Sequence, residues 1–381
     1  MNSTENINYE DLRAYREINL SNLKHNLLQI ESLLNNNCKV MAVVKADAYG
    51  HGAVEVSKYL QSLGIMHFAV ACIDEAIELR EAGIAGEILV LGYTPTSRKK
   101  DLIYYNISQT IVDINYAKEL CENEGILDVH IKLDTGMNRL GTKIEDIEEL
   151  SEIYKNEKLN IKGTFSHLSR ADSLLEEDVK FTNSQINKFY KTIDILEKSN
   201  IDVGKIHLQS SYGITNYKNL KCDLVRPGII LYGVSSMPYD KTLDELSLKP
   251  VLSLKTKIAS VKVIQESETV GYGNNFTSNR DMKIAVATIG YADGYPRGLS
   301  RYDFEVLING HVAKIIGNIC MDQMILDVSN IDSIKIGDTV TLIGEDKGGY
   351  ISIDAISEVT NTINNETLTA IGKRVSKIYI K

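Results

Sequence analysis

The 381-residue sequence contains no tryptophan, only five prolines and only five cysteines. The cysteines form no C-x-x-C pair and no other spacing typical of metal ligands, which argues against a disulfide framework and against a structural metal site. They are scattered through the chain at Cys38, Cys72, Cys121, Cys222 and Cys320. An odd, dispersed set is typical of a reducing compartment, so the sequence predicts a cytoplasmic protein without a metal centre.

Long apolar runs and an excess of basic residues are missing too. No apolar run approaches the ~20 residues that cross a membrane, and the polar, acidic start M-N-S-T-E-N-I-N-Y-E-D is unlike a signal peptide. The net charge of -9 argues against a broad nucleic-acid interface. We therefore expect a soluble protein that binds neither membrane nor nucleic acid. The chain length suits one large domain plus a smaller one.

Residues 40 to 233 alternate between short apolar runs and segments of helical length. Helical periodicity is clearest at 181–198, and a shorter helix at 73–82 is followed by Gly83, a residue typical of helix C-termini. Eight apolar runs predict strands, at 40–44, 67–71, 88–91, 110–112, 129–133, 161–165, 205–208 and 224–225. This count predicts an α/β protein with an N-terminal (β/α)8 TIM-like barrel. An open doubly wound sheet is the alternative, but no G-x-G-x-x-G opens a helix here.

The segments on either side of this alternation have a different character. A strand-like segment at 13–20 precedes an amphipathic helix that includes Leu23, for which Ser21 is a suitable N-cap. Residues 235–250 hold two of the five prolines; beyond them the hydrophobic period falls to two, and Asn309-Gly310 predicts a hairpin turn. We predict a barrel domain of residues 12–245 and a mostly β domain of residues 246–381. The first strand, at about 12–20, can pair with the C-terminal domain.

The first predicted strand of the barrel, V-M-A-V-V, ends at Lys45 and is followed by A-D-A-Y-G-H-G. In a barrel this position faces the active site, where burial lowers the pKa of an amine and makes it available as a Schiff-base nucleophile. A lysine that extends into solvent at a strand end is the alternative. Tyr49 and the glycines beside it suit the close approach of a ligand, which favours the first interpretation.

A second candidate site follows the seventh and eighth predicted strands. The segment H-L-Q-S-S-Y-G supplies Ser210 and Ser211, and R-P-G-I-I-L-Y-G supplies the backbone N–H groups of Gly228 and Ile229. Barrels often bind phosphate at this corner. A strand-end lysine and a phosphate corner together indicate pyridoxal phosphate (PLP), and Arg226 can then face the pyridine nitrogen. The alternatives are a simple turn at Gly228 and a rim ion pair at Arg226.

Seven segments make the chain similar to alanine racemases, the fold-type III family of PLP-dependent amino-acid racemases, over nearly its full length. These segments are V-V-K-A-D-A-Y-G-H-G, K-L-D-T-G-M-N-R-L-G, T-F-S-H-L-S, V-R-P-G-I-I-L-Y-G, V-G-Y-G-N-N-F, I-G-Y-A-D-G-Y-P-R and G-N-I-C-M-D-Q. They stand in the family's order and in both predicted domains. The resemblance implies a barrel followed by a β domain, and a head-to-tail homodimer whose active sites each combine one barrel with the partner's β domain.

The resemblance also implies a role for each matching residue. Lys45 would form the internal aldimine with PLP and act as one base, and Tyr272, supplied by the other subunit, would be the base on the opposite face. The cofactor would be held by barrel residues, which are Lys45, Tyr49, Arg139, His167, Ser210, Ser211, Arg226, Gly228 and Ile229. The substrate would contact Arg139, together with Tyr291 and Met321 from the other subunit. Lys132, a position often carbamylated in the family, would support Arg139, and Asp322 lies in the matching G-N-I-C-M-D-Q loop.

The activity implied by this resemblance is that of an isomerase that interconverts L- and D-alanine and supplies D-alanine for peptidoglycan in the cell wall. Two bases on opposite faces of PLP would remove the Cα proton from one face and return a proton to the other. A serine or broad-specificity racemase is the alternative within this class. A non-catalytic PLP-binding protein is disfavoured, because such carriers lack the β domain and Tyr272.

The sequence departs from the family pattern at three places. Ser210 stands where the family has asparagine, and a hydroxyl can still bind phosphate. Asn138 replaces a glycine in D-T-G-M-N-R, and asparagine tolerates a positive φ. Near the C-terminus, Asn365 and Lys373 stand where the family has tyrosines that narrow the substrate entry, and Ser376 replaces a proline. These changes imply a wider and more polar pocket, so the choice between alanine and serine stays open.

Overall fold

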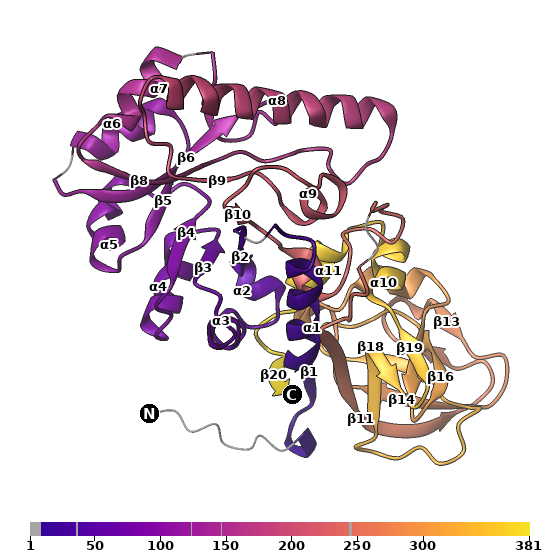
Figure 1. Ribbon diagram of the computed structural model, residues 1–381. Coiled ribbons are helices and arrows are strands. Elements are labelled where there is room, and N and C mark those ends of the chain that lie inside the picture. Colours follow the sequence, from indigo (N-terminus) through magenta and orange to yellow (C-terminus); the bar gives the residue numbers. More distant parts are fainter. Residues whose placement is uncertain (1–8, 36, 123, 146, 244–245) are drawn as a thin grey trace. The chain divides into compact units, whose positions relative to one another are not determined.

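The structure, a computed structural model, describes residues 9–35, 37–122, 124–145, 147–243 and 246–381 (Figure 1). Its contacts divide the chain into two units. One holds Lys24–Leu231 and Tyr239–Leu248, and the other holds Tyr232–Pro238, Lys249–Lys381 and the described part of Met1–Leu23. The polar start at residues 1–8 and residues 244–245, beside the predicted boundary, lie outside the described residues. The division into residues 12–245 and 246–381 therefore stays a prediction.

The larger unit contains the predicted (β/α)8 barrel, and all eight predicted strands are confirmed. Its parallel strands follow the order β10-β2-β3-β4-β5-β6-β8-β9, and a short β7 (Thr142–Lys143) pairs with β6. The eight strands are β2 (Lys39–Val43), β3 (His67–Val70), β4 (Glu87–Val90), β5 (Ser108–Ile111), β6 (Leu127–Asp134), β8 (Leu159–Phe165), β9 (Lys205–His207) and β10 (Leu224–Val225). Backbone hydrogen bonds close the gap between the last two, from Asp223 N–H to the Ile206 carbonyl at 2.8 Å and from Arg226 N–H to the Gln209 carbonyl at 2.9 Å.

Helices lie on the outside of these strands, as Figure 1 shows for α4 to α8. Phe189, Ile193 and Leu196 of α8 are buried, so the predicted helical periodicity at 181–198 is confirmed. Gly83 follows the end of α4 with a φ of +91°, which confirms its place at a helix C-terminus. The helices are α1 (Leu20–Glu31), α2 (Lys45–Tyr49), α3 (Ala53–Ser62), α4 (Ile73–Glu81), α5 (Lys99–Tyr104), α6 (Ile114–Glu122), α7 (Ile147–Tyr154), α8 (Glu176–Lys198) and α9 (Ser211–Asn216).

The N-cap predicted for the first helix is wrong. Helix α1 begins at Leu20, so Ser21 lies inside its first turn. The Asn19 side chain accepts a hydrogen bond from the Asn22 N–H at 2.9 Å, which is the contact that an N-cap residue makes. Apolar spacing predicts the helix, but several polar residues lie near its start. Because helix α1 begins directly after strand β1 ends, Asn19 is the residue in the N-cap position.

The smaller unit is mostly β, as predicted. Strand β11 pairs with both β14 and β18, so the order β11-β14-β17-β16-β15-β18 closes on itself as an antiparallel barrel. The turn Asn309-Gly310 joins β15 to β16 with φ values of +54° and +83°, which confirms the predicted hairpin. The strands of this sheet are β1 (Ala14–Asn19), β11 (Leu252–Ile264), β14 (Met282–Ala287), β15 (Glu305–Ile308), β16 (His311–Ile316), β17 (Met324–Asp327), β18 (Thr339–Asp346), β19 (Gly349–Ile351) and β20 (Ser376–Ile380).

Strand β1 belongs to this smaller unit. It pairs antiparallel with β11 and parallel with β20. Two more strands, β12 (Thr269–Val270) and β13 (Phe276–Thr277), form a separate hairpin, and α10 (Ile353–Thr360) and α11 (Asn364–Ala370) precede β20. Within the described ranges, no helix has both the length and the apolar character needed to cross a membrane.

The two candidate caps of α1 can be separated by mutation. We expect Asn19→Ala to lower the free energy of unfolding by about 1 kcal/mol, because the Asn22 N–H loses its acceptor. Ser21 is exposed, so Ser21→Ala should change it by less than about 0.5 kcal/mol. Urea unfolding of both variants measures the difference. Equal effects would contradict the assignment of the cap to Asn19.

Candidate active site

Lys45 follows strand β2 at the carboxyl end of the barrel, directly after the buried Val44. Burial, followed by the positive charge of Arg139, lowers the pKa of the Lys45 amine, and the carboxylate of Glu75 opposes this shift. The side chain therefore carries a larger neutral fraction than a solvated lysine does. A neutral amine is the form that attacks a carbonyl carbon.

The residues after Lys45 form a turn of left-handed backbone. Ala46, Asp47, Ala48 and Tyr49 have φ values of +51°, +55°, +54° and +53°. Each such residue other than glycine costs about 1–2 kcal/mol relative to right-handed backbone, so neighbouring groups must hold the turn in place. The Asp47 carboxylate does so in part, because it accepts a hydrogen bond from the Ala53 N–H at 2.9 Å.

Glu75 holds the start of the same turn. Its Oε1 accepts from the Ala46 N–H and its Oε2 accepts from the Ala71 N–H, both at 2.7 Å. One carboxylate of α4 thus fixes the backbone next to Lys45 and the end of the neighbouring strand β3. Sequence reasoning missed this residue. Its only signal was a position in the first turn of a predicted helix.

Three predicted segments meet at the phosphate corner. The Gly228 N–H donates to the Ser211 hydroxyl at 3.1 Å, and Ser210 and Arg226 form a bridge between their backbones. A Cβ atom at position 228 would lie 2.6 Å from the Tyr49 hydroxyl oxygen, so glycine is required for these groups to approach. The Tyr49 and Ser211 hydroxyl groups thus lie beside the backbone of Gly228. Ile229, the next residue, is buried.

Arg226 lies in the barrel interior with 4% of its surface exposed. Its guanidinium donates to His207 Nδ1 at 2.8 Å and to the Ser166 carbonyl at 2.7 Å, and it lies 3.5 Å from His167 Nδ1. Burial lowers the pKa of Arg226 to about 10. Burial and the charge of Arg226 hold the pKa of His167 well below its ordinary value, so that imidazole is neutral.

Lys132 is a second amine of the site and is more deeply buried than Lys45. Burial, and then the charges of Arg139 and Arg226, lower its pKa to about 8. Such an amine is partly neutral near neutral pH, the form that carbamylation requires, and this modification stays a prediction. Asn138, beside Arg139, has a φ of +55°, which confirms that asparagine supports the turn where the family has glycine. Asp134 Oδ1 accepts from the Asn138 N–H at 3.1 Å and fixes this turn.

The smaller unit contains the remaining predicted residues. Tyr272 lies in a short 3-10 helix between two glycines with positive φ, and 74% of its surface is exposed. The Tyr291 N–H donates to the Cys320 carbonyl at 3.1 Å, which brings Tyr291 beside the loop of Met321. Tyr291 and Met321 are exposed, at 43% and 52%. The role of these three residues in a barrel site stays a prediction.

A buried carboxylate fixes the loops of Tyr291 and Met321. Asp293 accepts from Arg13 at 2.5 Å and from the Gly290 N–H at 3.0 Å, and its Oδ1 lies 3.3 Å from Arg374 Nε. Arg374 also donates to Asp322 at 2.7 Å, in the residue after Met321. Burial alone would raise the pKa of Asp293, but the hydrogen bond from Arg13 holds it below its ordinary value. The sequence did not single out Asp293, although it lies in the I-G-Y-A-D-G-Y-P-R segment.

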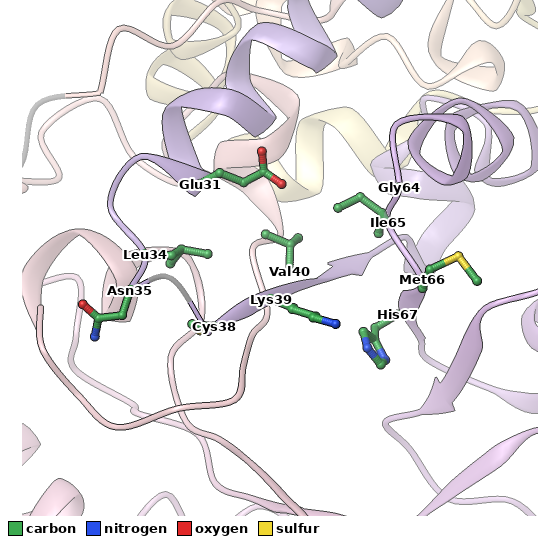
Figure 2. Close-up of a pocket in the computed structure, with 10 residues that line it drawn as sticks. All are labelled: Glu31, Leu34, Asn35, Cys38, Lys39, Val40, Gly64, Ile65, Met66 and His67. Atoms are coloured by element: carbon green, nitrogen blue, oxygen red, sulfur yellow. The ribbon is translucent and has the colours of Figure 1, made fainter.

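A cavity of about 370 Å³ lies at the opposite end of the barrel from Lys45 (Figure 2). Its lining comes from the starts of strands β2 and β3 and the turn after α1, including Lys39, Met66 and His67. None of the predicted site residues lines it. The carboxyl end of the strands, where barrel enzymes place their chemistry, is therefore the better candidate.

Comparison with known proteins agrees with this geometry. The model of the alanine racemase N-terminal domain matches residues 18–236, and that of the alanine racemase C-terminal domain matches residues 251–379. The chain belongs to the alanine racemase family. It is therefore an amino-acid racemase, and the fold and class predicted from the sequence are confirmed.

Individual relatives cover nearly the whole chain. An alanine racemase of Clostridium kluyveri is 42% identical over 97% of this chain and 94% of its own length. An amino-acid racemase of Enterococcus faecalis is 42% identical, and a serine/alanine racemase of Enterococcus gallinarum is 40% identical, each over 96% of this chain. The chain spans about half, 51%, of the length of these two Enterococcus proteins. The crystal structure of alanine racemase from Bacillus anthracis with bound L-Ala-P has a TM-score of 0.90 and 30% identity, over 97% of this chain and 95% of its own.

PLP is the cofactor of this family, and the side chains of this barrel fit it. Lys45 offers an amine of lowered pKa, and the corner of Tyr49, Ser211 and Gly228 offers two hydroxyl groups beside a glycine that has no room for a Cβ atom. Arg226 offers a cation that its hydrogen bonds fix in place, 3.5 Å from His167 Nδ1. An amine, a set of phosphate donors and a partner for a ring nitrogen are the three groups that PLP requires.

The carboxylate beside the Lys45 turn should govern cofactor affinity. In Glu75→Gln one backbone N–H faces the new NH2 group, so we expect the dissociation constant of PLP to rise about tenfold, in line with the loss of one hydrogen bond to a charged acceptor. Titration of the purified protein with PLP, followed by absorbance, measures it. Asp74→Asn is the matched control, because Asp74 is exposed and contacts Arg98 instead. An unchanged affinity in Glu75→Gln would contradict this role.

The Asp293 contacts give a second prediction. Asp293→Asn leaves Arg13 and Arg374 with an uncharged partner, so we expect the free energy of unfolding to fall by about 3 kcal/mol. We also expect a higher KM for the amino-acid substrate, because the Tyr291 and Met321 loops lose their anchor. Chemical denaturation and steady-state kinetics measure these changes. Asp303→Asn, at an exposed position of the same unit, should match the unaltered protein in both.

Proposed function

We propose that the protein interconverts L- and D-alanine with PLP by a two-base mechanism. The observation that carries the proposal is the half-buried Lys45 amine at the end of strand β2. Its pKa is lowered, and it lies in the same barrel as the corner formed by Tyr49, Ser211 and Gly228. A lysine that merely reached solvent would be exposed, whereas Lys45 is half-buried. Arg226 adds a cation whose hydrogen bonds fix its direction.

The mechanism assigns each side chain a task. When bound, PLP weakens the Cα–H bond of an attached amino acid by spreading charge over its ring. Lys45 holds the cofactor and takes or returns a proton at its Nζ atom on one face. Tyr272, from a second subunit, does the same at its phenolic oxygen on the other face. The corner around Gly228 binds the phosphate, and Arg226 donates to the pyridine nitrogen without readily giving up a proton, because its pKa stays at about 10.

The proposal includes a homodimer. Tyr272, Tyr291 and Met321 are exposed on the smaller unit and would complete the site of a second copy. Their exposure supports this, because large exposed aromatic and sulfur-containing side chains are typical of interfaces. The five cysteines are free, which supports a cytoplasmic location. D-alanine made there would serve peptidoglycan synthesis.

A serine or broad-specificity racemase is the second candidate, and one observation favours it. In the described part of the chain, the Asn365 Oδ1 atom is buried without a hydrogen-bond partner, at a position where the family has tyrosine. A buried acceptor of this kind favours a substrate that brings a hydroxyl group. Lys373, an exposed cation at the second tyrosine position, adds polarity. A relative named serine/alanine racemase supports the same alternative.

Racemisation of defined amino acids tests both candidates. We expect the PLP-saturated protein to convert L-alanine to the racemate, followed by chiral chromatography, and the rate ratio with L-serine decides the substrate. Tyr272→Phe should lower turnover by more than about 100-fold, the contribution of a general base, while PLP absorbance stays unchanged. Tyr302→Phe, an exposed tyrosine of the same unit, is the control. No racemisation of any amino acid, or full activity of Tyr272→Phe, would contradict the proposal.

A further inference from the structure

Four side chains form a continuous chain of hydrogen bonds through the interior of the barrel. Arg226 Nη1 lies 2.8 Å from His207 Nδ1, His207 Nε2 lies 2.8 Å from His130 Nδ1, and His130 Nε2 lies 2.8 Å from Glu87 Oε1. Both histidines are fully buried. The chain therefore runs from the arginine of the site, through strands β9 and β6, to the first residue of β4. We refer to these four residues as the relay.

The two ends of the relay fix every proton within it. A guanidinium can only donate, so His207 Nδ1 must accept from Arg226 and the ring carries its proton on Nε2. That proton is donated to His130 Nδ1, which leaves the His130 proton on Nε2. A carboxylate can only accept, and Glu87 Oε1 receives this last proton. All three hydrogen bonds point the same way, and both imidazoles are neutral.

The electrostatics agree with this direction. Burial, and then Arg226, hold the pKa of His207 well below its ordinary value, so the ring stays neutral. Burial opposes ionisation of Glu87, but hydrogen bonds from His130 and His67 hold its pKa well below its ordinary value. His67 Nδ1 lies 2.8 Å and Lys205 Nζ 3.6 Å from Glu87 Oε2. Glu87 is thus a fixed anion.

Arg226 itself has no such anion beside it in the part of the chain that the structure describes. Among the described residues, no carboxylate lies within ion-pair distance of its guanidinium, which is surrounded by carbonyl oxygens and neutral rings. The Phe165 ring is stacked on His207 at 4.7 Å and lies 5.0 Å from Arg226 Cζ, so it packs against both groups. In the described chain, the side-chain hydrogen bonds that start at Arg226 lead to one carboxylate, that of Glu87.

We propose that Glu87 is a positioning residue that acts on the cofactor through the relay. Its negative charge polarises the two neutral histidines, strengthens His207 Nδ1 as an acceptor, and so sets both the orientation of Arg226 and its strength as a donor. The proposal rests on the proposed function in one respect, the placement of the cofactor's pyridine nitrogen at Arg226. Carboxylates behind a metal-binding histidine fix its proton and orientation in this way, and their mutation costs about 10–100-fold in metal affinity or activity.

The far end of the relay is open to water. Glu87 borders a cavity of about 430 Å³ at the N-terminal end of the barrel, which Asp128, Lys162 and Lys205 also line. The carboxylate can therefore be changed without cutting into the cofactor site. Asp128 lines the same cavity and pairs with Lys162, but it contributes nothing to the relay. This makes Asp128→Asn a matched control for Glu87→Gln.

The first test reads the proton positions without any reaction. Nitrogen-15 spectra of the histidine-labelled full chain, with and without PLP, should show His130 and His207 as neutral rings protonated on Nε2. Glu87→Ala removes the acceptor and should release His130 from this single form, whereas Asp128→Asn should not. A charged ring, or protonation on Nδ1, in the unaltered protein would overturn the relay. This holds whether or not the protein racemises any amino acid.

The second test uses the PLP-saturated enzyme. Glu87→Gln keeps an acceptor but removes the charge, so Arg226 becomes a stronger donor to the ring nitrogen. We expect kcat to fall about tenfold with KM unchanged. We also expect a several-fold rise in the side reaction in which the amino group of alanine passes to the cofactor and pyruvate is released, followed with lactate dehydrogenase. Asp128→Asn should change neither rate.

The outcomes separate the two proposals. Equal behaviour of Glu87→Gln and Asp128→Asn in the active enzyme would overturn the role of Glu87 and leave the racemase proposal intact. An unaltered protein that binds PLP but racemises nothing would contradict the proposed function. In that case the nitrogen-15 spectra alone would test whether His130 and His207 carry their protons as the relay requires. A fall in activity caused only by poor folding would lower the PLP content and leave pyruvate release per turnover unchanged, which would also overturn the proposal.

Discussion

A buried arginine, with no carboxylate beside it among the described residues, is the constraint around which the barrel interior is arranged. An uncompensated charge in such a place is costly, and the side chain must satisfy its donors with whatever the strands provide. Here the carbonyl groups of Ser166, His207 and Leu208 and one imidazole nitrogen accept from Arg226. These acceptors belong to the ends of strands β8 and β9. The position of the cation is thereby tied to the strand register of the barrel.

The turn after Lys45 also depends on hydrogen-bond acceptors that nearby residues supply. Four consecutive residues adopt left-handed backbone, which no local preference of alanine supports. Asp47 within the turn and Glu75 of helix α4 supply the carboxylate acceptors that stabilise it. The turn brings the Tyr49 hydroxyl to Gly228, across the seam between β2 and β10. Strain in the backbone and closure of the barrel thus serve one corner of the site.

Much of this organisation could be read from the sequence. Strands buried on both faces leave apolar runs, so all eight barrel strands and the Asn309-Gly310 hairpin were predictable, and the ordered motifs identified the family. The polar interior was not predictable. His130 and His207 stand 77 residues apart, and Glu87 a further 43 from His130, and each looks like a single polar residue within a strand. Only the closed barrel brings them into line, just as only the end of β1 selects Asn19 over Ser21.

Strand β1 has a consequence for the way the chain is made. It is synthesised before the barrel, yet Ile18 pairs with Leu252 and Tyr379, so its partners leave the ribosome only after the barrel strands. Barrel segments can collapse during synthesis, since domains generally fold as units from the N-terminal side. Strand β1 meanwhile has an unpaired edge, which is the kind of surface that attracts other strands. The pairing of β1 therefore waits until residues 252–380 have been synthesised.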